Sequence, residues 1–322
     1  MKIITTFILL LSVMHLMAQD SRSMLIVVSA PGDPTYETEF ARQAASWQSL
    51  AAKAHMGVQT IGIGKESTDG DLLALKKSFN ALPKTGGDLW LVWIGHGSYD
   101  GRSANFNLRG QDIDSTLMRE LLKPFKRRLI IFNLFSASAP FLAETSGKDR
   151  LVISSTRSNG ERNYSRFGEK LADAITSSDA DLDLDGSLSL LEVFLHASSE
   201  TRAFYENEQR VLQEHAVIDD NGDGLGTSAD SFKGLRAETK SEDEAAPDGA
   251  TAREIHLLSH ATNALTPQAI DERAKLESSI DSLRVRKPEL TENDYYRKLE
   301  ILMLKMAKLY AKQPTSGIKK KP

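Results

Sequence analysis

The sequence predicts an α/β fold in three layers, with a parallel sheet between helices, followed by a helix–loop–helix and a C-terminal helical arm. Two apolar runs carry this prediction, Leu89–Ile94 and Leu129–Phe132. A short apolar run without alternation is typical of a strand that is covered on both faces. Segments of helical periodicity separate such runs along the chain, and this alternation predicts parallel strands joined by helices.

The elements follow in order from periodicity and turn residues. We expect strands over residues 24–29, 58–63, 89–94, 129–133 and 151–155, and a short strand or hairpin over 105–109. We expect helices over residues 35–55, 68–81, 114–122 and 166–176, and a long helical stretch over 189–215. The α/β domain is therefore assigned to residues 24–178.

The composition excludes several classes of function. The 322-residue chain contains no cysteine, which rules out disulfides, thiolate metal sites and a cysteine nucleophile. Its formal net charge is −4 and its pI is about 6.0, so no basic footprint indicates a nucleic acid partner.

The N-terminus predicts export. Residues 1–18 combine Lys2, the largely apolar stretch Ile3–Met17 and the small residue Ala18, as in a secretory signal peptide. An uncleaved anchor is the alternative, but the run is shorter than the ~20 residues of a spanning helix. We expect an exported protein, periplasmic or extracellular, with no membrane span after removal of the signal.

The C-terminal third is interpreted as appended segments. Residues 238–266 are polar, acidic and small, which indicates a linker. Residues 267–312 repeat leucine and isoleucine at helical spacing and predict a two-helix hairpin or coiled-coil arm, through which the chain could self-associate. Residues 313–322 end in a lysine run and are interpreted as a basic, solvated tail.

The EF-hand-like region, residues 166–230, contains a calcium-binding pattern. Residues 181–192 read DLDLDGSLSLLE, with acids at loop positions 1, 3 and 5, glycine at 6 and glutamate at 12. Calcium takes about 6–8 oxygen ligands, which alternate residues of a tight loop can direct inward. The predicted metal ligands are Asp181, Asp183, Asp185, Ser187, Ser189 and Glu192, and the predicted cofactor is Ca²⁺.

A second loop, residues 219–230, matches the pattern less completely. Asp219, Asn221 and Asp223 occupy positions 1, 3 and 5, but Gly226 replaces the aliphatic residue and Asp230 replaces the closing glutamate. We expect either a weaker calcium site or an ordinary turn rich in glycine and aspartate.

Two other segments resemble the caspase–legumain–gingipain clan of cysteine peptidases. LWLVWIGHGS places His96 after a buried strand, and LIIFNLFSASAPF places Ser136 at the corner that follows another. In that clan one strand ends in His-Gly and a later strand ends in a Cys-x-Ser-Gly type corner, and a Cys–His dyad hydrolyses peptides. The resemblance covers residues 24–175, puts Ser136 at the nucleophile and Ala139 at the usual glycine, and likens residues 154–163 to the substrate-pocket loop.

Serine at the nucleophile position leaves two hypotheses. A hydroxyl is far harder to deprotonate than a thiol, and it needs a base, an orienting acid and an oxyanion hole. Asp100 and Asp112 are candidate acids only by their proximity in sequence. The first hypothesis is an exported, non-catalytic calcium-binding protein with a caspase/legumain-like fold, which acts by binding a protein or peptide partner. The alternative is an exported serine hydrolase or peptidase that uses Ser136 and His96.

Overall fold

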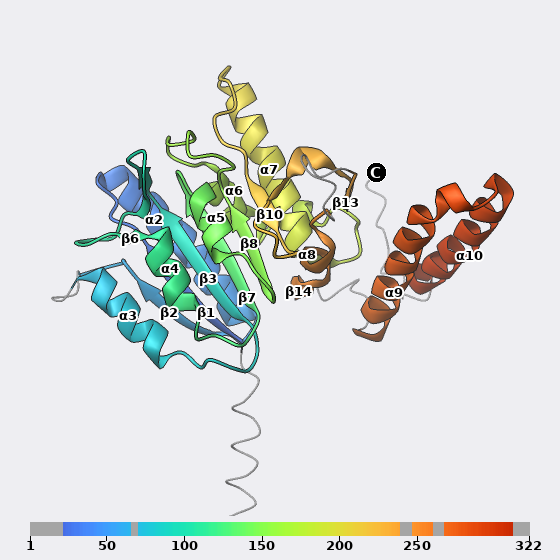
Figure 1. Ribbon diagram of the computed structural model, residues 1–322, viewed down its shortest axis with the longest axis horizontal. Coiled ribbons are helices and arrows are strands. Elements are labelled where there is room, and N and C mark those ends of the chain that lie inside the picture. The colour runs from blue at the N-terminus through green and yellow to red at the C-terminus, as the bar shows by residue number, and fades with distance from the viewer. Residues whose placement is uncertain (1–21, 66–69, 239–246, 260–266, 312–322) are drawn as a thin grey trace, which may run out of the picture. The chain divides into compact units, whose positions relative to one another are not determined.

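A seven-stranded sheet forms the centre of the α/β domain (Figure 1). The computed structural model describes residues 22–65, 70–238, 247–259 and 267–311. The sheet order is β11-β10-β8-β7-β3-β1-β2. Five strands are parallel: β1 (Ser23–Val28), β2 (Gly57–Ile61), β3 (Leu89–Gly95), β7 (Leu129–Phe135) and β8 (Arg150–Ser154). The short strands β10 (Val217–Asp219) and β11 (Thr227–Ser228) extend the β8 edge in antiparallel pairing. The predicted mixed fold with a mostly parallel sheet is confirmed.

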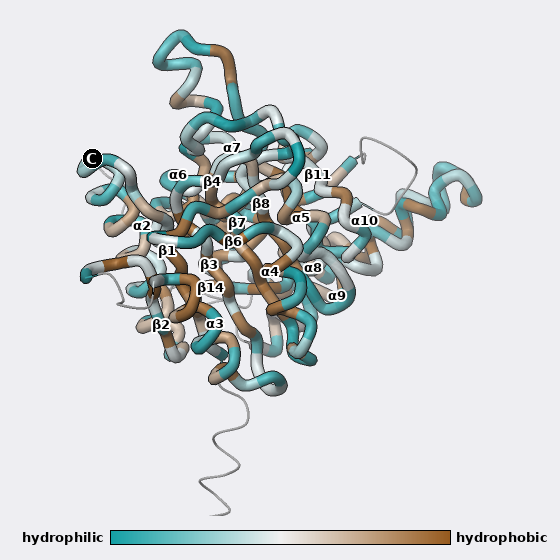
Figure 2. The backbone as a smooth tube through the Cα atoms, turned by 60° about the vertical axis from the view of Figure 1, so that its left-hand side comes forward, coloured by the Kyte–Doolittle hydropathy of each residue, from teal (hydrophilic) through white to brown (hydrophobic). Residues whose placement is uncertain are grey.

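Helices cover both faces of this sheet. One face packs against α3 (Asp71–Ala81), α4 (Ser115–Leu122) and α5 (Ala139–Thr145), whose apolar side chains join those of alternate strand residues in one core. The other face packs against α2 (Pro34–Lys53) and α6 (Phe167–Ala174), as the contact between Trp47 and Phe132 illustrates, with ring centroids 4.6 Å apart. Apolar colouring follows the strands around β1 and β3 in Figure 2. Burial on both faces is why these strands read as unbroken apolar runs.

The remaining elements precede the C-terminal helices in the chain. They are β4 (Gly97–Tyr99), β5 (Ala104–Phe106), β6 (Ile113–Asp114), η1 (Ser178–Ala180), β9 (Ser187–Ser189), α7 (Leu190–Asn207), η2 (Ala229–Ser231), β12 (Phe232–Lys233), β13 (Arg236–Ala237), α8 (Ala250–Glu254) and β14 (His256–Ser259).

The chain divides into two compact units. The first comprises the described residues up to Leu182 together with Ser189–Leu257, and the second comprises Asp183–Leu188 together with the described residues from Leu258 onward. The second unit contains α9 (Pro267–Val285), η3 (Lys287–Glu289) and α10 (Glu292–Ala311). α9 and α10 pack on each other, so the predicted C-terminal helices are present as a hairpin.

The long helix expected over residues 189–215 was wrong at its C-terminal end. α7 ends at Asn207, and Gln209 has φ +54°, a conformation incompatible with continuing a right-handed helix. The chain then forms β10, which pairs with β8. Helical periodicity alone could not reveal this strand, because its three residues are too few to show a period.

The linker expected over residues 238–266 is partly folded. Residue 238 and residues 247–259 of this segment are described, and the second of these stretches contains α8 and β14. Asp220 accepts hydrogen bonds from the backbone amides of Gly249 and Ala252, so an acid distant in sequence holds the first turn of α8. The composition predicts a polar segment, but it does not indicate that Asp220 accepts hydrogen bonds from this segment.

Some predictions fall outside the described residues. They are the signal peptide over 1–18, linker residues 239–246 and 260–266, and the basic tail over 313–322. Among the described residues, no helix combines the length and apolarity needed to cross a bilayer.

Candidate functional site

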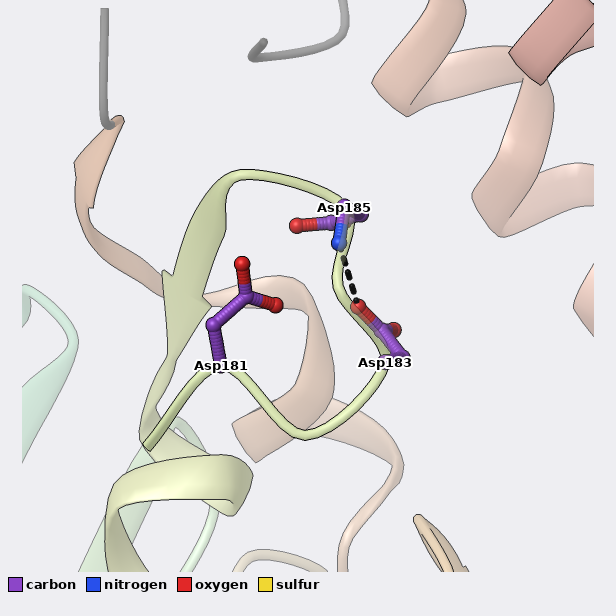
Figure 3. A group of neighbouring side chains, drawn as sticks. All are labelled: Asp181, Asp183 and Asp185. Carbon is purple, nitrogen blue, oxygen red and sulfur yellow. Dashed lines mark hydrogen bonds between the residues drawn. The ribbon is translucent and has the colours of Figure 1, made fainter. Parts of the chain in front are cut away.

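The first acidic loop brings its aspartates together. Asp181, Asp183 and Asp185 each offer a carboxylate oxygen, and these oxygens all lie within 4.8 Å of one another (Figure 3). The loop follows η1, a 3-10 helix of three residues, and leads through β9 into α7, so a full helix follows the acids but only a short turn precedes them. Like charges at this spacing repel, and a cation between them would relieve the repulsion.

The loop backbone is folded by its own side chains. The Asp183 carboxylate accepts from the Asp185 amide at 3.2 Å, and the Asp185 carboxylate accepts from the Ser187 amide at 2.7 Å. Leu184 and Gly186, at positions 4 and 6, have φ of +56° and +79°. These turns aim alternate side chains to the same side, which is the arrangement that a calcium loop needs.

Glu192 closes the loop onto the first turn of α7. Its carboxylate accepts from the Leu182 amide at 2.9 Å and from the Ser189 amide at 2.9 Å, while Ser189 Oγ accepts from the Glu192 amide at 3.3 Å. This is a capping box, and both residues are buried. Both Glu192 oxygens are therefore engaged, and among the described residues the cluster of carboxylate oxygens is that of Asp181, Asp183 and Asp185. These hard oxygens are the kind of ligand that calcium takes.

The second loop repeats the backbone of the first. Gly222 and Gly224, again at positions 4 and 6, have φ of +79° and +77°. Asn221 Oδ1 accepts from the Asp223 amide at 3.0 Å, and Asp223 Oδ1 accepts from the Leu225 amide at 2.8 Å. Positions 3 and 5 therefore make the same bonds in both loops, although this loop follows a strand instead of a helix.

The second loop nevertheless differs in its acids. Asp230 forms an ion pair with Arg202 and is exposed. Asp219 is buried and already accepts from Gly222, Gly224 and Ser146 Oγ. Among the described residues, the acids of this loop do not form a cluster like that of the first loop. The acids of the second loop are therefore less well placed to bind a cation than those of the first loop.

His96 lies in an aromatic enclosure. Its ring centroid is 4.6 Å from that of Tyr36, 5.0 Å from that of Phe40 and 5.9 Å from that of Tyr164. Burial lowers the pKa of His96 below its ordinary value, and a hydrogen bond with the Pro31 carbonyl opposes the shift. The neutral imidazole is therefore favoured.

Ser136 is buried and bonded to the glycine after His96. Its Oγ donates to the Gly97 carbonyl at 3.0 Å and accepts from the Gly97 amide at 3.2 Å. Within the described part of the chain, no hydrogen bond joins Ser136 to His96. The neighbouring Ala137 amide donates to the Glu161 carbonyl at 2.9 Å.

The glycines beside His96 have a packing role. A Cβ at Gly95 would lie 2.0 Å from Ser29 Oγ, and one at Gly97 would lie 2.2 Å from the Ser136 carbonyl oxygen. The close approach of these segments therefore requires glycine at both positions. Ala139 begins α5 with helical geometry, and the positive φ of this corner, +56°, is at Ala137 instead.

The remaining predicted residues are placed as follows. Asp100 accepts from the backbone of Arg102 and Ser103 in an exposed turn, and burial raises the pKa of Asp112. Neither residue is hydrogen-bonded to His96 in the described structure.

Sequence reasoning missed Arg273. This arginine is buried, and its guanidinium pairs with Asp183 and Asp185 and lies 2.9 Å from Glu277. Its only sequence signal is its place three residues before Leu276, on the apolar face of α9.

The chain shows only low similarity to the known proteins with which it was compared. No family model matches the chain, and no curated protein matches it. Among solved structures, the Drosophila initiator caspase Dronc is 13% identical with a TM-score of 0.42, covering 62% of this chain and 80% of that chain. The protein GSU0716 from Geobacter sulfurreducens is 13% identical with a TM-score of 0.41, covering 62% and 92%.

Caspase-1 from Spodoptera frugiperda is also similar. It is 9% identical with a TM-score of 0.41, covering 63% of this chain and 87% of that chain. Scores of this size carry no argument about the activity of the present chain.

Proposed function

We propose that this chain is an exported calcium-binding protein with a caspase-like α/β domain, which acts by binding a protein or peptide partner without catalysis. The observation that carries the proposal is the gathering of the Asp181, Asp183 and Asp185 oxygens within 4.8 Å in a loop with the full calcium-ligand spacing. Three carboxylates this close need positive charge nearby. The Arg273 guanidinium supplies one such charge to Asp183 and Asp185, and a calcium ion would supply two to the whole cluster.

The peptidase-like corner supports a non-catalytic role. A serine nucleophile needs a base within about 2.6–3.2 Å and free oxyanion donors. The Ser136 hydroxyl instead donates to the Gly97 carbonyl and accepts from the Gly97 amide, and the Ala137 amide donates to the Glu161 carbonyl. Among the described residues, no hydrogen bond positions His96 as a base for this hydroxyl.

Export and calcium binding are consistent with each other. The proposed signal peptide over residues 1–18 would deliver the chain to a compartment where calcium is more plentiful than in the cytoplasm. An exported site can therefore work with modest affinity, in the 10⁻⁴–10⁻³ M range of extracellular calcium modules.

Isothermal titration calorimetry with calcium tests the proposal. We expect heat of binding from the full chain, and loss of that heat from the first loop in an Asp181→Ala, Glu192→Gln variant. A matched control, Asp179→Ala with Glu208→Gln, removes two exposed acids outside the ligand positions and should bind normally. Folded wild-type protein that gives no heat with calcium would refute the proposal.

A fluorophosphonate probe tests the alternative. We expect no adduct by intact-protein mass spectrometry, with or without calcium. One adduct that disappears in Ser136→Ala would show an activated serine, and the hydrolase hypothesis would replace the non-catalytic one.

A further inference from the structure

Arg273 places a buried positive charge on two of the proposed calcium ligands. Asp183–Leu188 and α9 belong to the same compact unit. The Arg273 side chain is 7% exposed, and its terminal nitrogens pair separately with Asp183 and Asp185. Its Nε also donates to Glu277 one helical turn away, so the guanidinium is surrounded by three carboxylates.

These contacts identify the acidic cluster as a site that holds a cation within this chain. A buried charge is stable only when it is paired and hydrogen-bonded, and here each partner depends on the other. Removing Arg273 takes away the positive charge that the Asp183 and Asp185 carboxylates both face. Another cation that binds the same oxygens must therefore displace the Arg273 guanidinium.

Calcium and the guanidinium therefore compete. A calcium ion at the loop requires oxygens of Asp183 and Asp185, at positions 3 and 5. Those carboxylates cannot coordinate calcium and keep their bonds to Arg273 at full strength. Calcium also supplies two charges where arginine supplies one, so at sufficient concentration it compensates the cluster better.

We propose that Arg273 is a built-in competitor of calcium, so that calcium binding expels its guanidinium and releases α9 from the loop. This inference rests on the proposed calcium-binding function of the loop. Since the coupling of two equilibria is reciprocal, the affinity that calcium loses to Arg273 equals the stability that the Arg273 contact loses to calcium. The contact between α9 and the loop would then depend on whether calcium is bound.

Calcium titrations of three variants test the competition. We expect Arg273→Gln to bind calcium about tenfold more tightly than the wild type, and Arg273→Lys to fall between them because lysine lacks the planar fork. Arg284→Gln is the matched control: it lies on the same helix, but its ion-pair partner is Asp281. It should bind calcium like the wild type.

A distance measurement tests the release. Because the chain contains no cysteine, Leu184→Cys and Ser279→Cys introduce two unique, exposed positions for a fluorescent donor and acceptor. Energy transfer should fall when calcium is added, and magnesium at the same concentration should change it less.

The possible outcomes separate the two claims. If neither the wild type nor Arg273→Gln binds calcium, the proposed function fails and the competition fails with it. If all variants bind calcium with equal affinity, the function stands and the competition is refuted. Unchanged energy transfer at saturating calcium would overturn the release.

Discussion

Leu184 carries a side chain that its backbone conformation disfavours. At position 4 of the first loop its φ is +56°, whereas the second loop has glycine at the equivalent position, Gly222. The left-handed region costs a non-glycine residue about 1–2 kcal/mol, and glycine loses roughly 0.5–1 kcal/mol through its freer unfolded chain. The Leu184 side chain is highly exposed, so its removal sacrifices little packing.

We therefore expect Leu184→Gly to stabilise the folded protein by roughly 0.5 kcal/mol, the difference between those two terms. Urea unfolding measures this change. Leu182→Gly, two residues earlier and not at a positive φ, should give no gain. A Leu184→Gly protein that is less stable than the wild type would contradict the backbone strain that we infer at Leu184.

His96 gives the domain a predictable response to acid. Because burial lowers its pKa below the ordinary value of about 6.5, the unfolded chain binds the proton more readily than the folded one. The stability contributed by neutral His96 is present above pH ~6.5 and is lost as the pH falls from there through the folded pKa.

The measurement compares the free energy of unfolding at pH 7.5 and pH 5.5. In His96→Phe, which keeps an aromatic ring beside Tyr36 and Phe40, we expect a smaller loss at the lower pH. His196→Gln, on α7, serves as a control and should show the wild-type loss. An identical pH dependence in His96→Phe and the wild type would rule out this role for His96.

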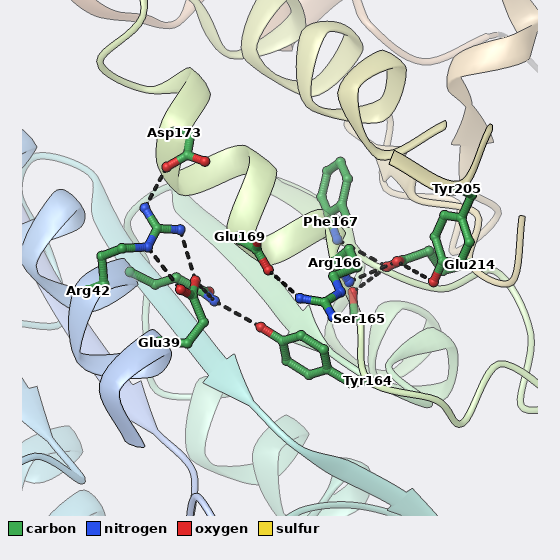
Figure 4. Close-up of polar contacts among 11 residues, drawn as sticks. Glu39, Arg42, Tyr164, Ser165, Arg166, Phe167, Glu169, Asp173, Tyr205 and Glu214 are labelled. Atoms are coloured by element: carbon green, nitrogen blue, oxygen red, sulfur yellow. Dashed lines mark hydrogen bonds and ion pairs between the residues drawn. The ribbon is translucent and has the colours of Figure 1, made fainter. Parts of the chain in front are cut away.

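At the scale of elements, Glu214 holds the start of α6. Its carboxylate accepts from the Arg166 amide at 2.8 Å, the Phe167 amide at 3.1 Å and Ser165 Oγ at 2.6 Å (Figure 4). Tyr205 of α7 donates to the same carboxylate at 3.1 Å. One buried side chain thus caps one helix and ties it to the next.

We expect Glu214→Ala to destabilise the protein by about 3 kcal/mol, because it strands several buried donors that each cost about 1–3 kcal/mol. Glu214→Gln should cost less, since its amide oxygen still accepts. Chemical denaturation measures both, and the exposed Glu208→Ala should change stability by less than about 0.5 kcal/mol. A loss below 1 kcal/mol in Glu214→Ala would show that water satisfies these donors.

The elements also show what local sequence can and cannot predict. Strands such as β3 and β7 were predictable because burial on both faces leaves an unbroken apolar run. β10 was not, since three residues carry no period and its pairing with β8 is set by tertiary contacts. The first loop was predictable because its proposed ligands lie within one short segment. The contact of Arg273 with that loop depends on how α9 packs, which no spacing encodes.

At the scale of the whole molecule, calcium should act as a stabilising ligand. An ion that binds only the folded state adds RT ln(1 + [L]/Kd) to the free energy of unfolding, about 2.7 kcal/mol at a hundredfold excess over Kd. The Arg273 contact reduces this gain by lowering the affinity, so Arg273→Gln should gain more than the wild type at equal calcium. These gains follow from the charge of the loop and need no catalytic chemistry.

Thermal unfolding with calcium and with a chelator checks this prediction. We expect calcium to raise the melting temperature of the wild type, and the Asp181→Ala, Glu192→Gln variant to lose most of that rise. A residual rise in the variant would assign calcium to the second loop, whose backbone at Gly222 and Gly224 follows the first. Magnesium should raise the melting temperature of the wild type less than calcium does, because this smaller ion gives up its bound water reluctantly. Equal melting temperatures with calcium and chelator, at calcium well above 10⁻³ M, would exclude a stabilising site in either loop.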